Sequence, residues 1–168
     1  MTKDAEMIDH LINDLASYDD SKRKSARDSL TAIGKRAIPR LVEVLKDRND
    51  LARLEATKAL AEIGDSEAAP ALVKTLEDEE FGIRWTAAEG LAGMRIEGLR
   101  ALFLALEQKP DEDLLREGAH HVLYFLARGD LKRYVTPVMA ALEGPAPIAQ
   151  TLVAAYRAMQ DMREAKLL

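Results

Sequence analysis

An internal repeat constrains this 168-residue chain more than any other feature of its sequence. The segment ARDSLTAIG at residues 26–34 recurs as ATKALAEIG at residues 56–64. The first alanine of the segment has four equivalents, spaced by 30, 31 and 32 residues: Ala26, Ala56, Ala87 and Ala119. A period of this length is typical of stacked repeats, in which each unit buries its apolar face only against its neighbours.

Each repeat begins with a pattern typical of a helix, which we name helix A. An apolar residue stands four and seven positions after each alanine, and this spacing places all three residues on one helical face. These apolar residues are Leu30, Ile33, Leu60, Ile63, Leu91, Met94, Leu123 and Leu126. Gly34 and Gly64 follow directly and are expected to end the helix, where a left-handed backbone is common.

Charged residues stand at fixed places before each alanine. Six positions before it we expect an aspartate as N-cap, because its carboxylate accepts hydrogen bonds from free N–H groups of the first turn. Phe81 takes that place in the third repeat. Three positions before each alanine stands an arginine, and such a column could bind anions. An aspartate three residues away is, however, a neighbour on the helix surface, so we expect ion pairs. A structural role is therefore assigned to Asp20, Arg23, Asp50, Arg53, Arg84, Asp113 and Arg116.

A second helix, which we name helix B, follows helix A in each repeat. Pro39 and Pro70 fall in its first turn, where a missing N–H group costs little. Its apolar stripe recurs in all four repeats and consists, in the first, of Ile38, Leu41, Val42 and Leu45. The pairing of the two helices indicates an all-α fold.

The two ends of the chain match single helices. Residues 8–15 follow the helix B stripe, whereas Leu152, Tyr156 and Met159 follow the helix A spacing. We therefore predict one domain over residues 1–168, an α-solenoid of about ten helices. Its four pairs and two half-repeats are expected near residues 19–47, 49–78, 80–109, 112–144, 4–17 and 146–165.

These positions together resemble a known repeat family. The pattern Asp-x-x-Arg-x-x-Ala-x-x-x-Leu-x-x-Ile-Gly, then Pro-x-Leu-x-x-x-Leu, resembles HEAT repeats, and its short form resembles the HEAT-like repeats of phycobilisome lyase subunits. The first repeat carries it in Asp20, Arg23, Ala26, Leu30, Ile33, Gly34, Pro39, Leu41 and Leu45. The resemblance implies a right-handed α-solenoid with the B helices on its concave side. It also implies protein binding far more often than catalysis.

Composition narrows the classes of function. A net charge of −5 disfavours nucleic-acid binding, although residues 20–40 carry seven Lys and Arg against two Asp. The chain has no Cys, which excludes disulfides and thiolate metal sites. Its apolar runs are far shorter than the ~20 residues of a membrane span, and MTKDAEMIDH lacks the apolar core of a secretory signal. We expect a cytoplasmic protein that does not enter a membrane.

Motifs for catalysis and metal binding are not found. The sequence contains neither a G-x-S-x-G nucleophile motif nor a phosphate-binding P-loop. Asp113, Glu117 and His121 share one helical face and could ligate a metal. The adjacent His120 points about 100° away from His121, and no further ligand is evident. HEAT-like hydroxylases hold iron with His-Glu dipeptides, which this chain lacks. We predict no metal and no cofactor.

Two surfaces are candidate partner sites. Opposite the apolar stripe of the B helices, the expected concave wall changes from charged to apolar along the chain, as protein-binding surfaces with a polar rim do. It comprises Arg40, Glu43, Asp47, Lys74, Asp78, Ala101, Leu104, Gln108 and Ala140. Alternatively, long neighbours or the C-terminal segment shield its apolar part. The second surface is a convex patch on the A helices, formed by Phe81, Trp85, Glu117, His121 and Tyr124. Aromatic side chains are favoured anchors, but Phe81 and Trp85 could instead fill gaps between layers.

The prediction is a non-enzymatic module that binds a peptide or protein on its concave helix-B surface, as a monomer or an end-to-end dimer. One alternative is an accessory subunit of a bilin lyase, which depends on analogy of fold alone. Another is nucleic-acid binding, as in alkylation-repair proteins built from HEAT-like repeats.

Overall fold

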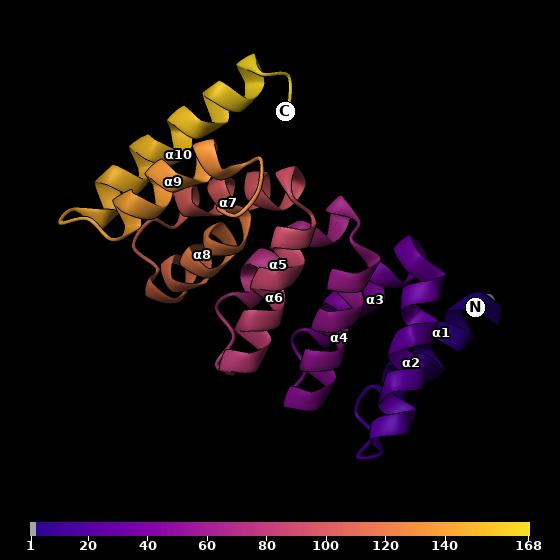
Figure 1. Ribbon diagram of the computed structural model, residues 1–168. Coiled ribbons are helices and arrows are strands. Elements are labelled where there is room, and N and C mark those ends of the chain that lie inside the picture. The colour runs from indigo at the N-terminus through magenta and orange to yellow at the C-terminus, as the bar shows by residue number, and fades with distance from the viewer. Residues whose placement is uncertain (1–2) are drawn as a thin grey trace.

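The computed structural model describes residues 3–168, which form ten α-helices and two short 3₁₀-helices and contain no strand (Figure 1). None of the helices in this range combines the length and apolar character needed to cross a bilayer. In chain order the elements are α1 (Lys3–Asp14), α2 (Asp20–Ile33), η1 (Gly34–Ala37), α3 (Ile38–Val44), α4 (Asp50–Ile63), η2 (Ser66–Ala68), α5 (Ala69–Thr75), α6 (Phe81–Gly93), α7 (Ile96–Gln108), α8 (Asp113–Leu126), α9 (Lys132–Leu142) and α10 (Pro147–Glu164).

The helices stack as a solenoid, which confirms the predicted fold class. α2, α4, α6 and α8 lie side by side and form what we call the A row (Figure 1). α1, α3, α5 and α7 form the B row, and each B helix packs against the A helix that follows it in the chain. The termini lie at opposite ends of the stack (Figure 1).

Small residues, including the buried column of alanines, line the A row. All four alanines, and the leucines four positions after them, are at most 2% exposed. Small residues let the backbones approach closely, since a Cβ atom added to Gly90 of α6 would lie 2.6 Å from the Cβ atom of Ala61. Each pair therefore buries its apolar stripe against the next pair, and one core runs along the stack.

The N-caps lie one residue before the predicted ones. Asp19 has an extended backbone, and its carboxylate accepts hydrogen bonds from two N–H groups in the first turn of α2. Asn49 caps α4 in the same way. The N-cap role predicted for Asp20, Asp50 and Asp113 is therefore wrong, because these residues are already helical. Their carboxylates stand in the first turn, where the helix dipole favours negative charge.

A residue with positive φ follows three of the four A helices, α2, α4 and α6. Gly34 and Gly64 follow α2 and α4 with φ angles of 68° and 64°, as the sequence predicts. Arg95, between α6 and α7, has a φ of 54° and a ψ of −111°. Such a conformation is open mainly to glycine and costs other residues about 1–3 kcal/mol. The third repeat therefore contains local backbone strain at Arg95.

The predicted role of α10 as a further A helix is wrong. α10 packs chiefly on α9 and α7, so it lies beside the B row and does not extend the A row beyond α8 (Figure 1). Its buried face contains Thr151, Ala155, Ala158 and Met162, whereas Tyr156 is 58% exposed. The physical reason is size, because three small side chains at this spacing allow a close approach to α9 that a tyrosine stripe would prevent.

Replacing Arg95 with glycine should raise the free energy of unfolding by about 1 kcal/mol, because glycine adopts the left-handed backbone without steric strain. Chemical denaturation measures the change. The matched control is Arg95→Ala, which keeps the strained φ and removes only the exposed ion pair with Asp130. An equal gain in both variants would show that the arginine side chain, and not the backbone, limits stability.

Candidate functional site

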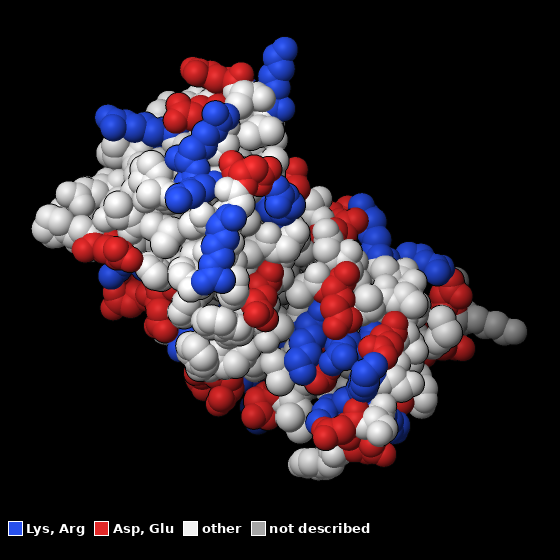
Figure 2. All heavy atoms as spheres, viewed as in Figure 1, with Lys and Arg blue, Asp and Glu red and all other residues white. Residues whose placement is uncertain are grey.

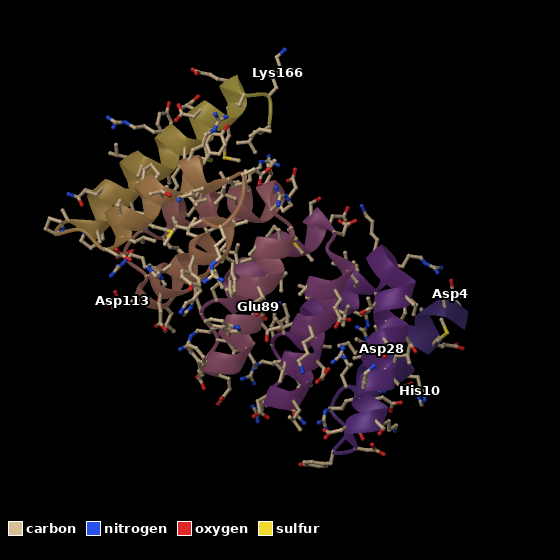
Figure 3. The ribbon with its side chains drawn as sticks, in the orientation of Figure 1. Asp4, His10, Asp28, Glu89, Asp113 and Lys166 are labelled. Carbon is tan, nitrogen blue, oxygen red and sulfur yellow. The ribbon has the colours of Figure 1, made fainter. Side chains whose placement is uncertain are left out.

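The basic segment at residues 20–40 is neutralised by ion pairs. Six of its seven Lys and Arg side chains lie within 2.8 Å of a carboxylate, and the seventh, Arg23, pairs with Asp20. Three of the partner carboxylates come from α1, whose Asp4 is labelled in Figure 3: Asp4, Asp9 and Asp14. The segment therefore presents no unpaired cation to a phosphate.

The arginine column ties each A helix to the loop that precedes it. Three of the guanidinium groups donate to the backbone carbonyl six residues earlier, at 2.6, 3.0 and 2.9 Å: Arg23 to Ser17, Arg53 to Asp47 and Arg84 to Asp78. Arg53 also donates to both carboxylate oxygens of Asp78, in the loop before the next A helix. Arg116 pairs with Asp113 in its own helix. The four side chains are only 12–22% exposed, so the column does not form an open anion ladder.

A buried ion network, which the sequence reasoning missed, joins α2 to α4. Glu55 is 6% exposed, and its carboxylate accepts hydrogen bonds from Arg27 at 2.6 Å and Lys58 at 2.9 Å. Burial by itself would raise the pKa of Glu55, but the hydrogen bonds from Lys58 and Arg27 outweigh burial and lower that pKa. The sequence does indicate this network, because the residue at the position of Glu55 is uncharged in the other three repeats.

A cleft of about 430 Å³ lies between α5 and α7 in the B row. Val73, Ala101 and Ala105 give it apolar walls, and Leu104 beside them is 41% exposed. Glu97, Arg100 and Gln108 form its polar rim. An apolar cleft of this kind can take one aliphatic or aromatic side chain of a partner.

A second cleft, of about 580 Å³, lies between α3 and α5 and shares Pro70 with the first. Its apolar part includes Val42, Leu45 and Ala71, and its charged part includes Lys46 and Lys74. The three carboxylates that line it are already paired with Lys35, Lys109 and Arg53: Glu67, Glu77 and Asp78. Among residues 3–168 no ion pair involves either lysine of the cleft, so the α3/α5 cleft carries unpaired positive charge.

The residues predicted for the concave wall separate into three groups. Those that line the two clefts are Lys74, Asp78, Ala101, Leu104 and Gln108. Arg40 and Glu43 pair with each other outside them, and the carboxylate of Asp47 accepts a hydrogen bond from the N–H group of Asn49. Ala140 is exposed on α9, which packs on α8 and α10. The structure thus brings together the central part of the predicted wall but not its two ends.

An aromatic cluster lies on the A row, where α6 faces α8. The ring of Trp85 lies 5.1 Å from His121 and 5.3 Å from Phe125, and Phe81 lies 6.0 Å from Trp85. Tyr124 stands next to Phe125, with 6.1 Å between the rings. Phe81 and Tyr124 are 52% and 43% exposed, so the cluster is open to solvent at both ends. The sequence reasoning missed Phe125, although it stands four residues after His121.

The candidate metal ligands are not assembled. Asp113 pairs with Arg116, Glu117 lies 3.7 Å from Arg84, and His121 packs against the aromatic rings. No group of three His, Cys, Asp or Glu side chains within residues 3–168 is arranged to hold a metal ion.

The family follows from the repeat itself. The sequence model of HEAT repeats matches residues 8–92. The chain belongs to the HEAT-repeat family. That range covers the first two HEAT pairs and most of α6, where the alanine column and the terminal glycines are most regular. No curated protein matches the sequence.

One solved structure supports the fold. A chain in the complex of CpcE and CpcF of phycocyanin lyase from Nostoc sp. PCC7120 is similar with a TM-score of 0.61 and 24% sequence identity. The match covers 89% of this HEAT chain and 98% of that chain. A designed armadillo repeat protein has a TM-score of 0.41 and 18% identity, over 94% of this chain and 87% of its own. At these identities the likeness is one of fold.

Replacing Glu55 with glutamine should lower the free energy of unfolding near pH 7 by about 2 kcal/mol, because a half-buried Arg27 loses its nearest and most buried charged partner. The folded-state pKa of Glu55 lies below the ordinary value of 4.5, so its contribution to stability is present above about pH 4.5 and is lost as the pH falls through the folded-state pKa. Urea denaturation at neutral pH and near pH 3 measures both free energies. The control is Glu62→Gln at a 45% exposed side chain, with an expected loss under about 0.5 kcal/mol. A loss for Glu55→Gln that does not shrink in acid would contradict this account.

Proposed function

We propose that this HEAT-repeat chain is a non-enzymatic interaction module that binds an extended segment of a protein partner along its B row. The observation that carries the proposal is the α5/α7 cleft, where exposed Leu104 stands beside apolar walls and a polar rim. Exposed apolar surface of this kind inside a polar rim is typical of protein interfaces.

The two clefts define which segment fits. They lie on opposite sides of α5 and meet at Pro70. Packed helices are spaced by about 8–10 Å, and an extended chain in the polyproline II conformation advances about 3.1 Å per residue with about three residues per turn, so side chains three residues apart point the same way and enter neighbouring clefts. The α5/α7 cleft suits an apolar side chain, and unpaired Lys46 and Lys74 suit a carboxylate in the α3/α5 cleft. The partner segment then carries an acidic and a bulky apolar residue three positions apart.

Two other functions have less support. The likeness to a lyase chain is a likeness of fold at 24% identity, and it does not extend to chemistry. Nucleic-acid binding requires free basic surface, and the basic segment at residues 20–40 is ion-paired throughout.

Replacing Leu104 with glutamate should abolish binding of the partner segment without lowering stability, because Leu104 is already 41% exposed. A displayed library of random short peptides, selected in parallel on wild type and on Leu104→Glu, tests this. Wild type should enrich peptides with an acidic and an apolar residue three positions apart, and the variant should not. Val153→Glu on α10, at a 52% exposed position, is the matched control and should enrich the same peptides as wild type. Peptides enriched equally on Leu104→Glu would refute the site.

Replacing Lys74 with glutamate should weaken binding of a selected acidic peptide about tenfold, because a favourable charge pair becomes a repulsive one. Changing the acidic residue of that peptide to lysine should restore binding to the variant. Isothermal titration of the four combinations measures this exchange. Failure of the changed peptide to recover would place the acidic residue elsewhere on the surface.

A further inference from the structure

The aromatic cluster on α6 and α8 is a second unusual surface of the molecule, and its position is independent of the B-row clefts. We propose that it is a docking site for a positively charged segment of a protein partner.

Phe81 occupies a place that the fold does not reserve for an apolar side chain. The equivalent residues in the other three repeats are Asp20, Asp50 and Asp113, each the first residue of its A helix. Phe81 is 52% exposed, so it does not fill a gap between layers. Trp85 is half-buried and makes the closer ring contacts between α6 and α8, with His121 and Phe125, whereas the ring of Phe81 meets His121 edge-on at 6.1 Å. The repeat therefore does not require a phenylalanine at this position, because aspartate stands there in the other three layers.

The outer face of the A row changes character along the stack. Figure 2 shows dense mixed charge over α2 and α4, and a largely uncharged area over α6. In the first two layers the charges pair across the row, as Arg27 does with Glu55. In the third and fourth layers aromatic rings meet across the row, with Trp85 and His121 in contact, and the ion pair between Arg84 and Glu117 is longer, at 3.7 Å. Trp and Tyr are over-represented among the residues that dominate binding energy at interfaces.

The surroundings of the aromatic cluster are acidic. Residues 77–93 and 109–121, which include α6 and the first half of α8, carry nine carboxylates and three basic side chains. The three basic side chains are already engaged by backbone carbonyls or carboxylates: Arg84, Lys109 and Arg116. Within residues 3–168, five of the carboxylates have no ion pair: Glu79, Glu80, Glu89, Asp111 and Glu112. This rim attracts cations and repels phosphate groups.

The exposed rings already interact with guanidinium groups. Arg84 lies over the ring of Phe81, 5.6 Å from its centroid, and Arg128 lies 4.5 Å from the centroid of Tyr124. Arginine on an aromatic face gains cation–π energy in addition to apolar contact. An arginine or lysine of a partner can use the remaining ring surface while the acidic rim binds its neighbours.

A second copy of this chain does not supply such a segment. Its most basic stretch, residues 20–40, is ion-paired side chain by side chain. A membrane surface or a nucleic acid carries the same sign of charge as the rim. The occupant that fits is a basic segment of a different protein.

Replacing Phe81 with aspartate provides the test, because the fold accepts aspartate at this place in three other repeats. A displayed library of random short peptides is selected in parallel on wild type and on Phe81→Asp. Wild type should enrich a class of peptides with net positive charge that the variant does not enrich. The chosen peptides should bind the variant about thirtyfold more weakly, the usual loss for an anchor residue. The variant's melting temperature should not fall.

This substitution separates the aromatic anchor from simple charge attraction. Phe81→Asp makes the site more acidic, so tighter binding of the basic peptides to the variant would refute the proposal. Trp85 is the single tryptophan of the chain, and its fluorescence should change on binding of the same peptides. Leu104→Glu should leave this binding intact, which separates it from the B-row site. Enrichment only of neutral or acidic peptides, or of none that distinguish wild type from Phe81→Asp, would overturn the inference.

Discussion

The close contact between small side chains in the A row is the interaction on which the rest of the structure depends. A single helix pair cannot bury its apolar stripe, so it is stable only when another pair covers it. Gly90 of α6 lies so close to Ala61 of α4 that an added Cβ atom would clash, and the column of alanines at Ala26, Ala56, Ala87 and Ala119 is buried in the same row. Larger side chains in that column would separate the layers and open the leucine core on both sides.

Hydrogen bonds from the arginine column add to this packing. The guanidinium groups of Arg23, Arg53 and Arg84 bind carbonyls of the preceding loops and so fix where each A helix begins. These guanidinium groups are largely buried and already hydrogen-bonded, so they are not available to a partner. Partner binding therefore depends on positions that the repeat does not constrain. Such positions carry ion pairs in the first two layers and aromatic rings in the next two. One architecture thus presents two chemically different outer faces.

The surface that is accessible to a partner also differs along the stack. The B-row clefts flank α5, between α3 and α7. α3 and α5 are short, with seven residues each, whereas α7 has 13. Beyond α7 the row is occupied by α10, which packs on both α7 and α9. The regular stacking therefore ends in the B row, which carries the proposed peptide site. The aromatic cluster lies on the A row and stays exposed to solvent.

The sequence by itself determined the helix pairs, their number, their order and the buried column, because a period near thirty residues with fixed apolar spacing has few other solutions. It also indicated Leu104 and Phe81 as exposed candidates. Only the tertiary structure decided that Asp19 and not Asp20 is the cap, that Glu55 is buried among cations, and that α10 joins the B row. The reason is physical: a repeat pattern reports contacts that recur in every layer, whereas caps, ion networks and terminal helices depend on neighbours that occur once.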